Sequence, residues 1–556
     1  MPCLTSPEAN VPRPVPGSFF QASSSPSGIL CHQPAPGGRV ITALQEEQMG
    51  LHDFTFYNVV RRNSLSFGNK PAWLEVETGD RFSYLETRVR IEKVAAGLRR
   101  HGLKKGDRVG ILAKNCYEYF LVIGGAAALG AIVLPVNWRL SEEEVRFILK
   151  DGEPSLLFVD EEFSGLARAL SPDLPFVKEC FSLASAVDGL VPFESLLQEG
   201  KSLAPEEVST DDGFVIIHTA AVAGRPRGAL LSHGNVLCAD MHFAYNLGIS
   251  HRDVHLCFLP LFHVGGLFMT TSCFHIGAFN LNMKRFDAAQ AAKAVEEQGV
   301  SFMMVFSPIL SAILDEQKKQ GLDIHSLRAV TGIDTAETIE RYQSLTGGDF
   351  YVLYGQTETS CLATLGPYRE RPGSAGRVLP LAEVRLVDDY DRTVETGKVG
   401  EITVKGPMVF KGYWGLSEET AYTFRDGWHH TGDMGRFDEE GYLWYAGRSP
   451  AKELIKPGGE NVYPAEVEKV ILLHPAVEKT VVFGVPDPKW KEGIKAVCQV
   501  KSGKSLSPQE LIDFVGERIA RYKKPKYVEL VEELPLLENG SIDRNKVKAI
   551  YGGEGS

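Results

Sequence analysis

The sequence predicts an α/β fold with largely parallel sheets, and three observations support this prediction. From residue 50 onward, short runs of apolar and β-branched residues alternate with segments of helical periodicity. Several of these runs are apolar throughout, which is typical of strands covered on both faces of a parallel sheet. The chain has 556 residues, which at roughly 150 residues per structural unit corresponds to about three or four units.

The elements of the first part follow this alternation. Buried strands are predicted at residues 108–112 (RVGIL), 214–217 (FVII) and 350–353 (FYVL). Ser141 with Glu144 three residues later is a capping-box pattern, and it predicts a helix over residues 141–150. The first part of the chain therefore mixes helices with strands that are buried on both faces.

One stretch, residues 119–136, is apolar enough to be compared with a membrane span. Gly124, Gly125 and Gly130 interrupt it, and the β-branched pattern at residues 132–134 ends it. A buried helix, a glycine turn and a buried strand explain this pattern better, so no membrane span is predicted.

Two changes of pattern divide the rest of the chain. After about residue 378, the segments 383–387, 401–404 and 442–445 predict shorter strands joined by turns, which indicates a β-rich subdomain. Beyond that, a helix is predicted to begin at Pro464, and a strand is predicted at residues 480–483. This last region predicts a small, separate α+β domain.

Charge and cysteine content exclude some classes of function. The net charge is −12, and nucleic-acid binding rewards a basic face, so no nucleic-acid partner is expected. None of the nine cysteines forms a CxxC pair, so no zinc site is expected. Their odd number and wide spacing indicate reduced thiols in a cytoplasmic protein.

The first motif is the segment 219–228 (TAAVAGRPRG), which follows a predicted buried strand and precedes a helix start at Ser232. A loop of small residues between a strand and a helix can present backbone N–H groups to a phosphate. Arg225 and Arg227 add positive charge. An ordinary strand–helix turn would have a similar composition, so this motif alone leaves both interpretations open.

The second motif, residues 354–358 (YGQTE), directly follows a predicted strand. Its glycine lets a ligand approach the backbone, its threonine offers a hydroxyl, and its glutamate can hold Mg²⁺ through water. A polar turn is the alternative interpretation.

The third and fourth motifs lie in the C-terminal half. Asp433, in Thr431-Gly432-Asp433, can accept both hydroxyls of a ribose, and Arg448 can donate to the same sugar; a surface salt bridge is the alternative. Residues 452–468 (KELIKPGGENVYPAEVE) combine a glycine pair, basic residues and a helix start, which suits either phosphate binding or a turn.

In this order and at these distances, the four motifs resemble those of the adenylate-forming superfamily, which contains acyl-CoA synthetases, luciferases and the adenylation domains of peptide synthetases. The resemblance extends from about residue 50 to residue 548 and is especially specific at GGENVYPAEVE. It also includes residues 259–263 (LPLFH), 373–377 (GSAGR), 484–487 (GVPD) and 521–525 (RYKKP).

The resemblance implies a domain organisation. Residues 49–447 would form a large AMP-binding domain of two α/β sheets and a small β subdomain. Residues 448–556 would form a small, mobile α+β domain.

The resemblance also implies a reaction in two halves. A carboxylate attacks the α-phosphate of ATP and forms acyl-AMP and pyrophosphate. The small domain then turns about a hinge near Arg448, and CoA thiolate attacks the acyl-AMP. ATP, Mg²⁺ and CoA are the implied cofactors, and a fatty or aromatic carboxylic acid is the implied substrate.

Carried over position by position, the resemblance implies a role for each site residue. Glu358 would be the Mg²⁺-associated carboxylate, and Thr357 would face phosphate. The remaining nucleotide-binding positions would be the phosphate loop with Thr219, Gly224 and Arg227, the adenine-pocket loop with Gly332 and Asp334, the segment Tyr354, Gly355 and Gln356, and the ribose pair Asp433 and Arg448.

The acyl and thiol sites are implied in the same way. His263 and Gly265 would line the acyl pocket, although a lone histidine can equally belong to a protein core. Lys456, Gly458 and Gly459 would border the CoA tunnel.

The sequence departs from the superfamily pattern at two phosphate-handling sites. Residues 219–224 read TAAVAG, where the superfamily usually has TSGTTG, and Arg227 replaces a lysine. Ser541 occupies the position of the catalytic lysine, a change that would cost about 10²–10³ in rate if nothing compensates. The hinge segment 449–451 (SPA) is also slightly longer than usual and contains a proline that would restrict it.

These departures keep alternatives open beside an AMP-forming acid–CoA ligase. The chain could be an adenylation-impaired member that binds nucleotide or acyl-CoA, or one that performs mainly the thioester half-reaction. The sequence does not identify the acid, and a homodimer is compatible with it.

The first 48 residues differ from the rest, because they are rich in Pro, Ser and Gly and lack hydrophobic periodicity. They contain no basic segment followed by a long apolar run, so no secretory signal is predicted. We expect either that Met49 is the true start or that residues 1–48 are a disordered tail. Mass spectrometry of the native N-terminus tests this, and a mature chain that begins at residue 1 or 2 contradicts the start-site version.

Overall fold

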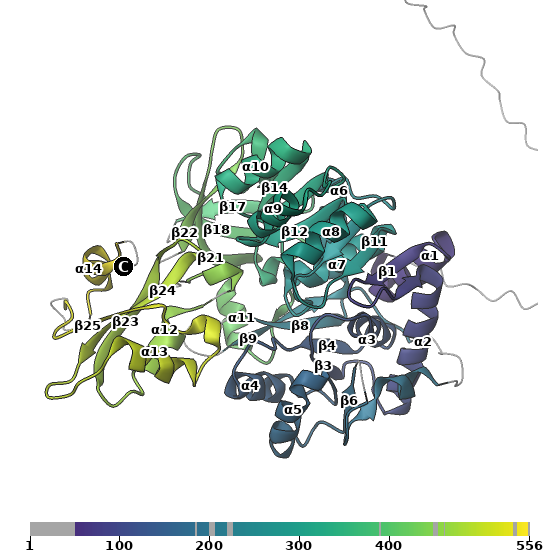
Figure 1. The fold of residues 1–556 in the computed structure, drawn as a ribbon, viewed down its shortest axis with the longest axis horizontal. Helices are drawn as coiled ribbons and strands as arrows, with labels where there is room; N and C mark the ends of the chain where they lie inside the picture. The colour runs from purple at the N-terminus through teal and green to yellow at the C-terminus, as the bar shows by residue number, and fades with distance from the viewer. Residues whose placement is uncertain are drawn as a thin grey trace, which may run out of the picture. The chain divides into compact units, whose positions relative to one another are not determined.

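The computed structural model describes residues 51–553, apart from residues 184–185, 199–205, 220–225, 389–390, 449–453, 461 and 537–541. Within this part of the chain, helices and strands alternate up to about residue 354, and the strands form four sheets (Figure 1). A large region with two mixed sheets and an antiparallel sheet precedes a smaller region with its own sheet, which confirms the predicted α/β fold class.

The first sheet contains the strands that later surround the candidate site. Its inner strands β14, β13, β12, β10, β11 and β1 run parallel, and antiparallel strands flank them. In spatial order the described strands are β16 (Arg377–Val378), β15 (Thr364–Pro367), β14 (Asp349–Tyr354), β13 (Ala329–Ile333), β12 (Phe302–Phe306), β10 (Val254–Cys257), β11 (Phe279–Asn282), β1 (Pro71–Glu75) and β2 (Arg81–Ser83).

The second sheet is also largely parallel. In spatial order its described strands are β19 (Gly412–Tyr413), β9 (Arg227–Ser232), β8 (Gly213–Thr219), β4 (Ile132–Pro135), β3 (Arg108–Leu112), β5 (Leu156–Val159), β6 (Glu179–Ser182) and β7 (Val191–Pro192). Strands β3 and β8 confirm two of the predicted buried strands. The third predicted strand is present as β14, but only Phe350 of residues 350–353 is buried, and the other three are partly exposed. Apolar residues of β3, β4, β5 and β8 share one buried cluster with Trp73 of β1 and Met304 of β12, so the first two sheets share a core.

The loop after β8 differs from the expected strand–helix connection. Strand β8 pairs with β9 as an antiparallel hairpin, in which Thr219 lies opposite Arg227. Strand β9 forms because Ala229 and Leu231 alternate into the core. The expected helix, α6 (His233–Asn246), begins only after β9, with Ser232 as its N-cap.

The third sheet confirms the predicted β-rich subdomain. Its described strands all pair antiparallel: β17 (Glu383–Val387), β18 (Gly400–Lys405), β21 (Trp428–Phe437), β20 (Phe424–Arg425) and β22 (Leu443–Arg448). The fourth sheet, β23 (Val477–Asp487), β24 (Lys491–Val500) and β25 (Tyr527–Val531), has helices α12, α13 and α14 in the same region, as an α+β domain requires.

The helices confirm the two sequence patterns that predicted helix starts. Ser141 caps α4 and forms the reciprocal capping box with Glu144, and Pro464 is the first residue of α12. The other helices are α1 (Phe56–Ser66), α2 (Tyr84–Arg100), α3 (Tyr117–Ala128), α5 (Ser164–Leu170), α7 (Val264–Ile276), α8 (Ala288–Gln298), α9 (Ile309–Gln320), α10 (Ala336–Thr346), α11 (Ser417–Thr423), α13 (Pro508–Gly516) and α14 (Arg544–Tyr551), with α4 at Glu142–Gly152 and α12 at Pro464–Ile471.

The apolar stretch 119–136 folds as predicted, into the buried helix α3, a glycine turn and the buried strand β4. Among the described residues, no helix is both long and apolar enough to cross a bilayer. The described cysteines carry free thiols.

A buried ion cluster links α4 with the C-terminal region. Lys523 is 1% exposed, and its Nζ lies 2.5 Å from Glu144 of α4 and 3.0 Å from Glu466 of α12. Glu144 also accepts a hydrogen bond from the Ala520 backbone N–H. Burial lowers the pKa of the Lys523 ammonium, but the two carboxylates outweigh burial and raise the pKa, so the ammonium stays charged.

Replacing Lys523 with methionine removes one positive charge and leaves two buried carboxylates close together. We expect Lys523→Met to lower the free energy of unfolding by about 3–5 kcal/mol, the usual cost of removing one partner from a buried ion pair. The measurement is urea denaturation followed by tryptophan fluorescence. The matched control is Lys524→Met, because Lys524 is the next residue and is exposed. Equal unfolding midpoints for the two variants would contradict the expectation.

Candidate active site

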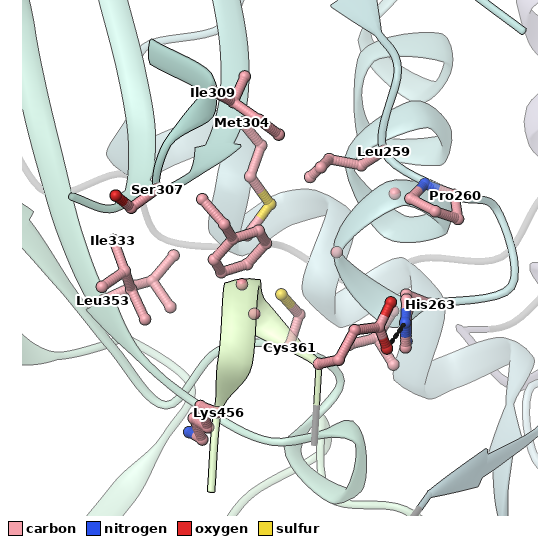
Figure 2. A pocket seen from close by; sticks show the side chains of 18 of the residues that line it. Leu259, Pro260, His263, Met304, Ser307, Ile309, Ile333, Leu353, Cys361 and Lys456 are labelled. Atoms are coloured by element: carbon pink, nitrogen blue, oxygen red, sulfur yellow. Dashed lines mark hydrogen bonds and ion pairs between the residues drawn. The ribbon is translucent and has the colours of Figure 1, made fainter. Parts of the chain in front are cut away.

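The candidate site lies at the carboxyl ends of the parallel strands of the first sheet. Strands β10, β12, β13 and β14 run in the same direction, so the residues that follow them meet at one edge. In open α/β sheets, ligands bind in the crevice outside this edge. A pocket of about 370 Å³ occupies this place (Figure 2).

The pocket brings together predicted residues that are far apart in the sequence. His263 and Gly265 from the predicted acyl site line it, as do Gly355, Gln356 and Thr357 from the YGQTE motif and Lys456, Gly458 and Gly459 from the predicted CoA site. Figure 2 shows that His263, Lys456, Leu259 and Met304 line the same pocket. The roles of these residues stay predictions.

Most of the apolar wall was not predicted from the sequence. The unpredicted apolar lining is Leu259, Pro260, Val264, Gly266, Met304, Phe306, Ile309, Ile333, Leu353, Cys361 and Trp490. The unpredicted polar lining is Arg139, Ser307, Glu460, Lys491 and Glu492. Position after the end of a parallel strand was the one signal that could have indicated Phe306, Ser307 and Ile333.

The carboxylate of Asp433, beside the pocket, accepts hydrogen bonds from four side chains. Oδ2 accepts from the Tyr354 hydroxyl at 2.9 Å and from Gln356 Nε2 at 2.6 Å, and Oδ1 accepts from Arg448 Nε at 2.9 Å and from the Tyr445 hydroxyl at 3.4 Å. Asp433 and Arg448 do form a salt bridge, as the alternative interpretation expected, but Asp433 is 2% exposed, so the pair is buried and does not lie on the surface. The predicted ribose carboxylate is therefore held in place by side chains of three predicted site residues.

Glu358 lies beside the end of the phosphate-loop hairpin. Its Oε1 accepts a hydrogen bond from the Tyr413 hydroxyl at 2.8 Å, and the Arg227 guanidinium lies 4.1 Å from the centre of the Tyr413 ring. Arg227 Nε is buried and has no hydrogen-bond partner among the described residues, which suits a residue that faces an anion.

The residues around Glu358 fit a Mg²⁺ ion that arrives with phosphate groups. Glu358 is buried, and its carboxylate has acceptor positions beyond the one that Tyr413 uses. Mg²⁺ is usually bound by one or two carboxylates together with substrate phosphates. Among the described residues, no group of three or more His, Cys, Asp and Glu side chains could hold a metal.

The predicted adenine loop follows β13. Gly332 has φ +143°, and a Cβ at this position would lie 1.8 Å from the Val305 carbonyl oxygen, so only glycine fits against β12. Asp334 Oδ2 is buried without a hydrogen-bond partner among the described residues, and burial raises the pKa of Asp334.

A charged cluster connects the Gly458–Gly459 loop with the pocket wall. Glu460 forms ion pairs with Arg139 and with His263, whose Nε2 lies 3.1 Å from Glu460 Oε2. Burial raises the pKa of Glu460, but His263 and Arg139 outweigh burial and hold this pKa at about 2. The His263 side chain is 40% exposed, so the alternative of a core histidine is wrong.

Some predicted site features lie outside the described residues. They are Gly224 with the altered loop 220–225, the hinge segment 449–451, and Ser541. Thr219 is described, as the last residue of β8.

The fold and the position of the pocket define the class of protein. Two α/β sheets with a shared core, an antiparallel sheet and a small C-terminal α+β region form the architecture of adenylate-forming enzymes. The chain belongs to the AMP-binding enzyme family: residues 60–414 match the AMP-binding enzyme profile, and residues 466–541 match the profile of the AMP-binding enzyme C-terminal domain.

Similar proteins include acid–CoA ligases. The indoleacetate–CoA ligase of Aromatoleum aromaticum is 33% identical, over 84% of this chain and 93% of that protein. The 2-succinylbenzoate–CoA ligase of Bacillus cereus is 32% identical, over 86% of this chain and 95% of that protein. Among solved structures, Mycobacterium tuberculosis fatty acyl CoA synthetase has a TM-score of 0.67 at 30% identity, covering 90% of this chain and 98% of that chain. A double mutant of Bacillus subtilis o-succinylbenzoate CoA synthetase has a TM-score of 0.77 at 27% identity, and the match covers 88% of this chain and 98% of that chain.

Asp433→Asn tests the predicted ribose contact. The amide cannot accept from both ribose hydroxyls and leaves Arg448 without its carboxylate, so we expect AMP to bind about ten- to a hundredfold more weakly, since hydrogen bonds to charged groups contribute about 1.5–3 kcal/mol. Isothermal titration calorimetry with AMP measures this. Asp438→Asn is the matched control, because Asp438 forms the same kind of ion pair, with Arg371, and accepts from Trp444 and from the Tyr442 backbone instead of from predicted site residues. Equal AMP affinities for the two variants would refute the role.

Proposed function

We propose that this protein is an AMP-forming acid–CoA ligase, which activates a fatty or aromatic carboxylic acid as an acyl-adenylate and transfers the acyl group to CoA. One observation carries the proposal: the predicted acyl residue His263, the nucleotide residue Thr357 and the thiol-side residue Gly458 line a single pocket. Relatives named as acid–CoA ligases, which match over most of the chain, support it.

The apolar walls of the pocket favour a substrate acid whose main part is apolar. The side chains between β10, β12 and β14 are aliphatic, aromatic or sulfur-containing, as at Leu259, Phe306 and Leu353. The charged groups lie toward the Lys456–Glu460 segment, where the predicted CoA site is. An apolar acid would therefore bury its tail among these walls and keep its carboxylate toward the polar part of the pocket.

In the proposed first half-reaction, an oxygen of the acid attacks the α-phosphorus of ATP, and the bond to the bridging oxygen breaks, which releases pyrophosphate. Asp433 and Arg448 would hold the ribose, and Arg227 would face the phosphates. Glu358 would hold the Mg²⁺ that accompanies ATP, and this ion would offset phosphate charge.

In the proposed second half-reaction, the CoA thiolate attacks the acyl carbon and AMP leaves. The Gly458–Gly459 pair suits the entry of a thiol arm, because neither residue adds a side chain beside Phe306 and Trp490. As part of the proposal, residues 49–447 form the adenylation domain, and residues 448–556 form a mobile domain that changes position between the two halves. The free thiols of the described cysteines support a cytoplasmic location.

A second candidate is a protein that performs mainly the thioester half-reaction. Ser541 stands where the adenylation lysine is expected, and this favours the second candidate. The ion pairs of Glu460 also favour it, because they hold the glycine pair at the pocket without any help from that lysine.

Pyrophosphate release with ATP, Mg²⁺, CoA and a panel of fatty and aromatic acids tests the proposal. We expect wild-type turnover, and the best acid identifies the substrate class. Where no other group compensates for Ser541, we expect Ser541→Lys to raise the rate of the acid-plus-ATP route by about 10²–10³, because one positioned donor is restored. The rate from synthetic acyl-AMP plus CoA should change little, since the lysine serves the first half only.

The matched control is Ser505→Lys, which adds the same charge at an exposed position in the C-terminal region. Turnover of acyl-AMP plus CoA without turnover of any acid plus ATP would favour the second candidate. Absence of both activities in the wild type and in Ser541→Lys would overturn the proposed function.

A further inference from the structure

A second, narrower cavity lies directly behind the apolar wall of the pocket. It is too narrow to hold a water molecule. Its lining comes from β10 (His255, Leu256 and Cys257), from the segment after β10 (Phe258 and Leu259), from α7 (Gly265, Gly266 and Met269) and from Met304 of β12. The two cavities share Leu259, Gly265, Gly266 and Met304. The same four residues thus form the wall between the pocket and the crevice behind it.

The crevice is apolar and uncharged at neutral pH. Its one titratable imidazole, His255, is 2% exposed and its Nδ1 pairs with Asn280 Oδ1 at 2.8 Å. Burial lowers the pKa of His255 to about 4, so the ring is neutral above this pH. The crevice is too narrow for an acyl tail while Met304 closes it, but once the Met304 side chain moves, its lining would suit an apolar chain. It would reject a second carboxylate, because its described lining residues include no cation to pair with the charge.

Met304 is the adjustable part of the wall. Gly265 and Gly266 have no side chain, and the Leu259 side chain is branched, whereas Met304 has a flexible, unbranched thioether. Met304 comes from the middle of β12, is 2% exposed, and extends into the pocket (Figure 2). Its backbone is fixed by the sheet, so a change of side-chain rotamer alone can open or close the way into the crevice.

We propose that the Met304 side chain is a partition between the pocket and the crevice, and that it limits the length of the acid's apolar tail. The acid is then a monocarboxylate, whose tail ends at Met304 or, when this side chain moves, extends past it into the crevice. This inference rests on the proposed function, because it names the substrate class of the same pocket. Met304 is a specificity-determining residue in this proposal and takes no part in bond making.

Gly265 provides an independent way to thicken the same wall. A Cβ at Gly265 would lie 3.4 Å from Met304 Sδ and 3.5 Å from its Cε, which is ordinary van der Waals contact. A Cβ at Gly266 would instead lie 2.3 Å from the Pro260 carbonyl oxygen, so that position does not tolerate alanine. Gly265→Ala should therefore fold, press against Met304 and shorten the space for the tail.

The test compares wild type with Met304→Ala, Gly265→Ala and the matched control Met303→Ala. Met303 is the next residue of β12, is also buried, and belongs to the core cluster on the opposite face of the sheet. Two readouts use acids from hexanoate to tetradecanoate: kcat/KM for pyrophosphate release, and calorimetric affinity for the corresponding acyl-sulfamoyl adenosines, which mimic acyl-AMP without reacting.

We expect Met304→Ala to raise the preference for the longest over the shortest tail by about tenfold or more, and Gly265→Ala to lower it by a similar factor, since one methylene in an apolar pocket changes specificity about 10- to 200-fold. Met303→Ala should keep the wild-type length profile even if it destabilises the core.

Length profiles that are identical in wild type, Met304→Ala and Gly265→Ala would overturn the partition. If Met304→Ala does not fold, the shift in Gly265→Ala decides the question. If the adenosine analogues show the shift while no acid is turned over, the partition stands and the proposed ligase activity fails. If acids are turned over but the length profiles of the variants equal that of the wild type, the ligase activity stands and the partition fails.

Discussion

The parallel pairing of β10, β12, β13 and β14 is the constraint on which the site depends. Parallel neighbours place all their carboxyl ends at one edge, so the segments after these strands must converge there. Each segment then contributes a different surface: Leu259 to Gly266 after β10, Phe306 and Ser307 at β12, Ile333 at β13, and Gly355 to Thr357 after β14. The buried core shared with the second sheet keeps this edge rigid, because β12 packs its Met304 face against it. A site built on rigid strands can hold polar groups in fixed positions and still present an apolar wall.

Charged clusters connect the C-terminal region with the larger region at two places. Glu460 is buried and pairs with the partly exposed Arg139 and His263 at the pocket, whereas Lys523 is buried together with Glu144 of α4 and Glu466. Buried ion pairs add little net stability, because desolvation offsets the attraction between the charges, but an unpaired member is costly. These clusters therefore specify one docked arrangement more than they strengthen it.

At position 227, the predicted phosphate side of the site differs from the superfamily pattern but keeps its charge. Arg227 keeps a positive charge where a lysine is usual, but its planar guanidinium lies over the Tyr413 ring instead of moving as a point charge on a flexible stem. Tyr413 in turn donates to Glu358, so the cation and the carboxylate are positioned through one aromatic side chain. This contact links β9 and β19 of the second sheet to the YGQTE segment, which follows β14 of the first.

The sequence predicted the fold class and those elements that leave strong local signals, such as β3, β17 and α4. The charged pocket residues Arg139, Glu460, Lys491 and Glu492 were not predicted. Period-2 alternation gave the bounds of β17 to the residue, and the Ser141–Glu144 pair identified the start of α4. Strand β9 was missed, because its six residues lie between a glycine-containing loop and a capping signal that both resembled a direct turn into a helix. The apolar wall at Met304 and the pairing of Arg139 with Glu460 could not be predicted, because a contact between residues so far apart depends on how sheets and side chains pack in three dimensions. The local sequence determines which face of a helix or strand is buried. Which residues that face contacts is determined only by the tertiary structure.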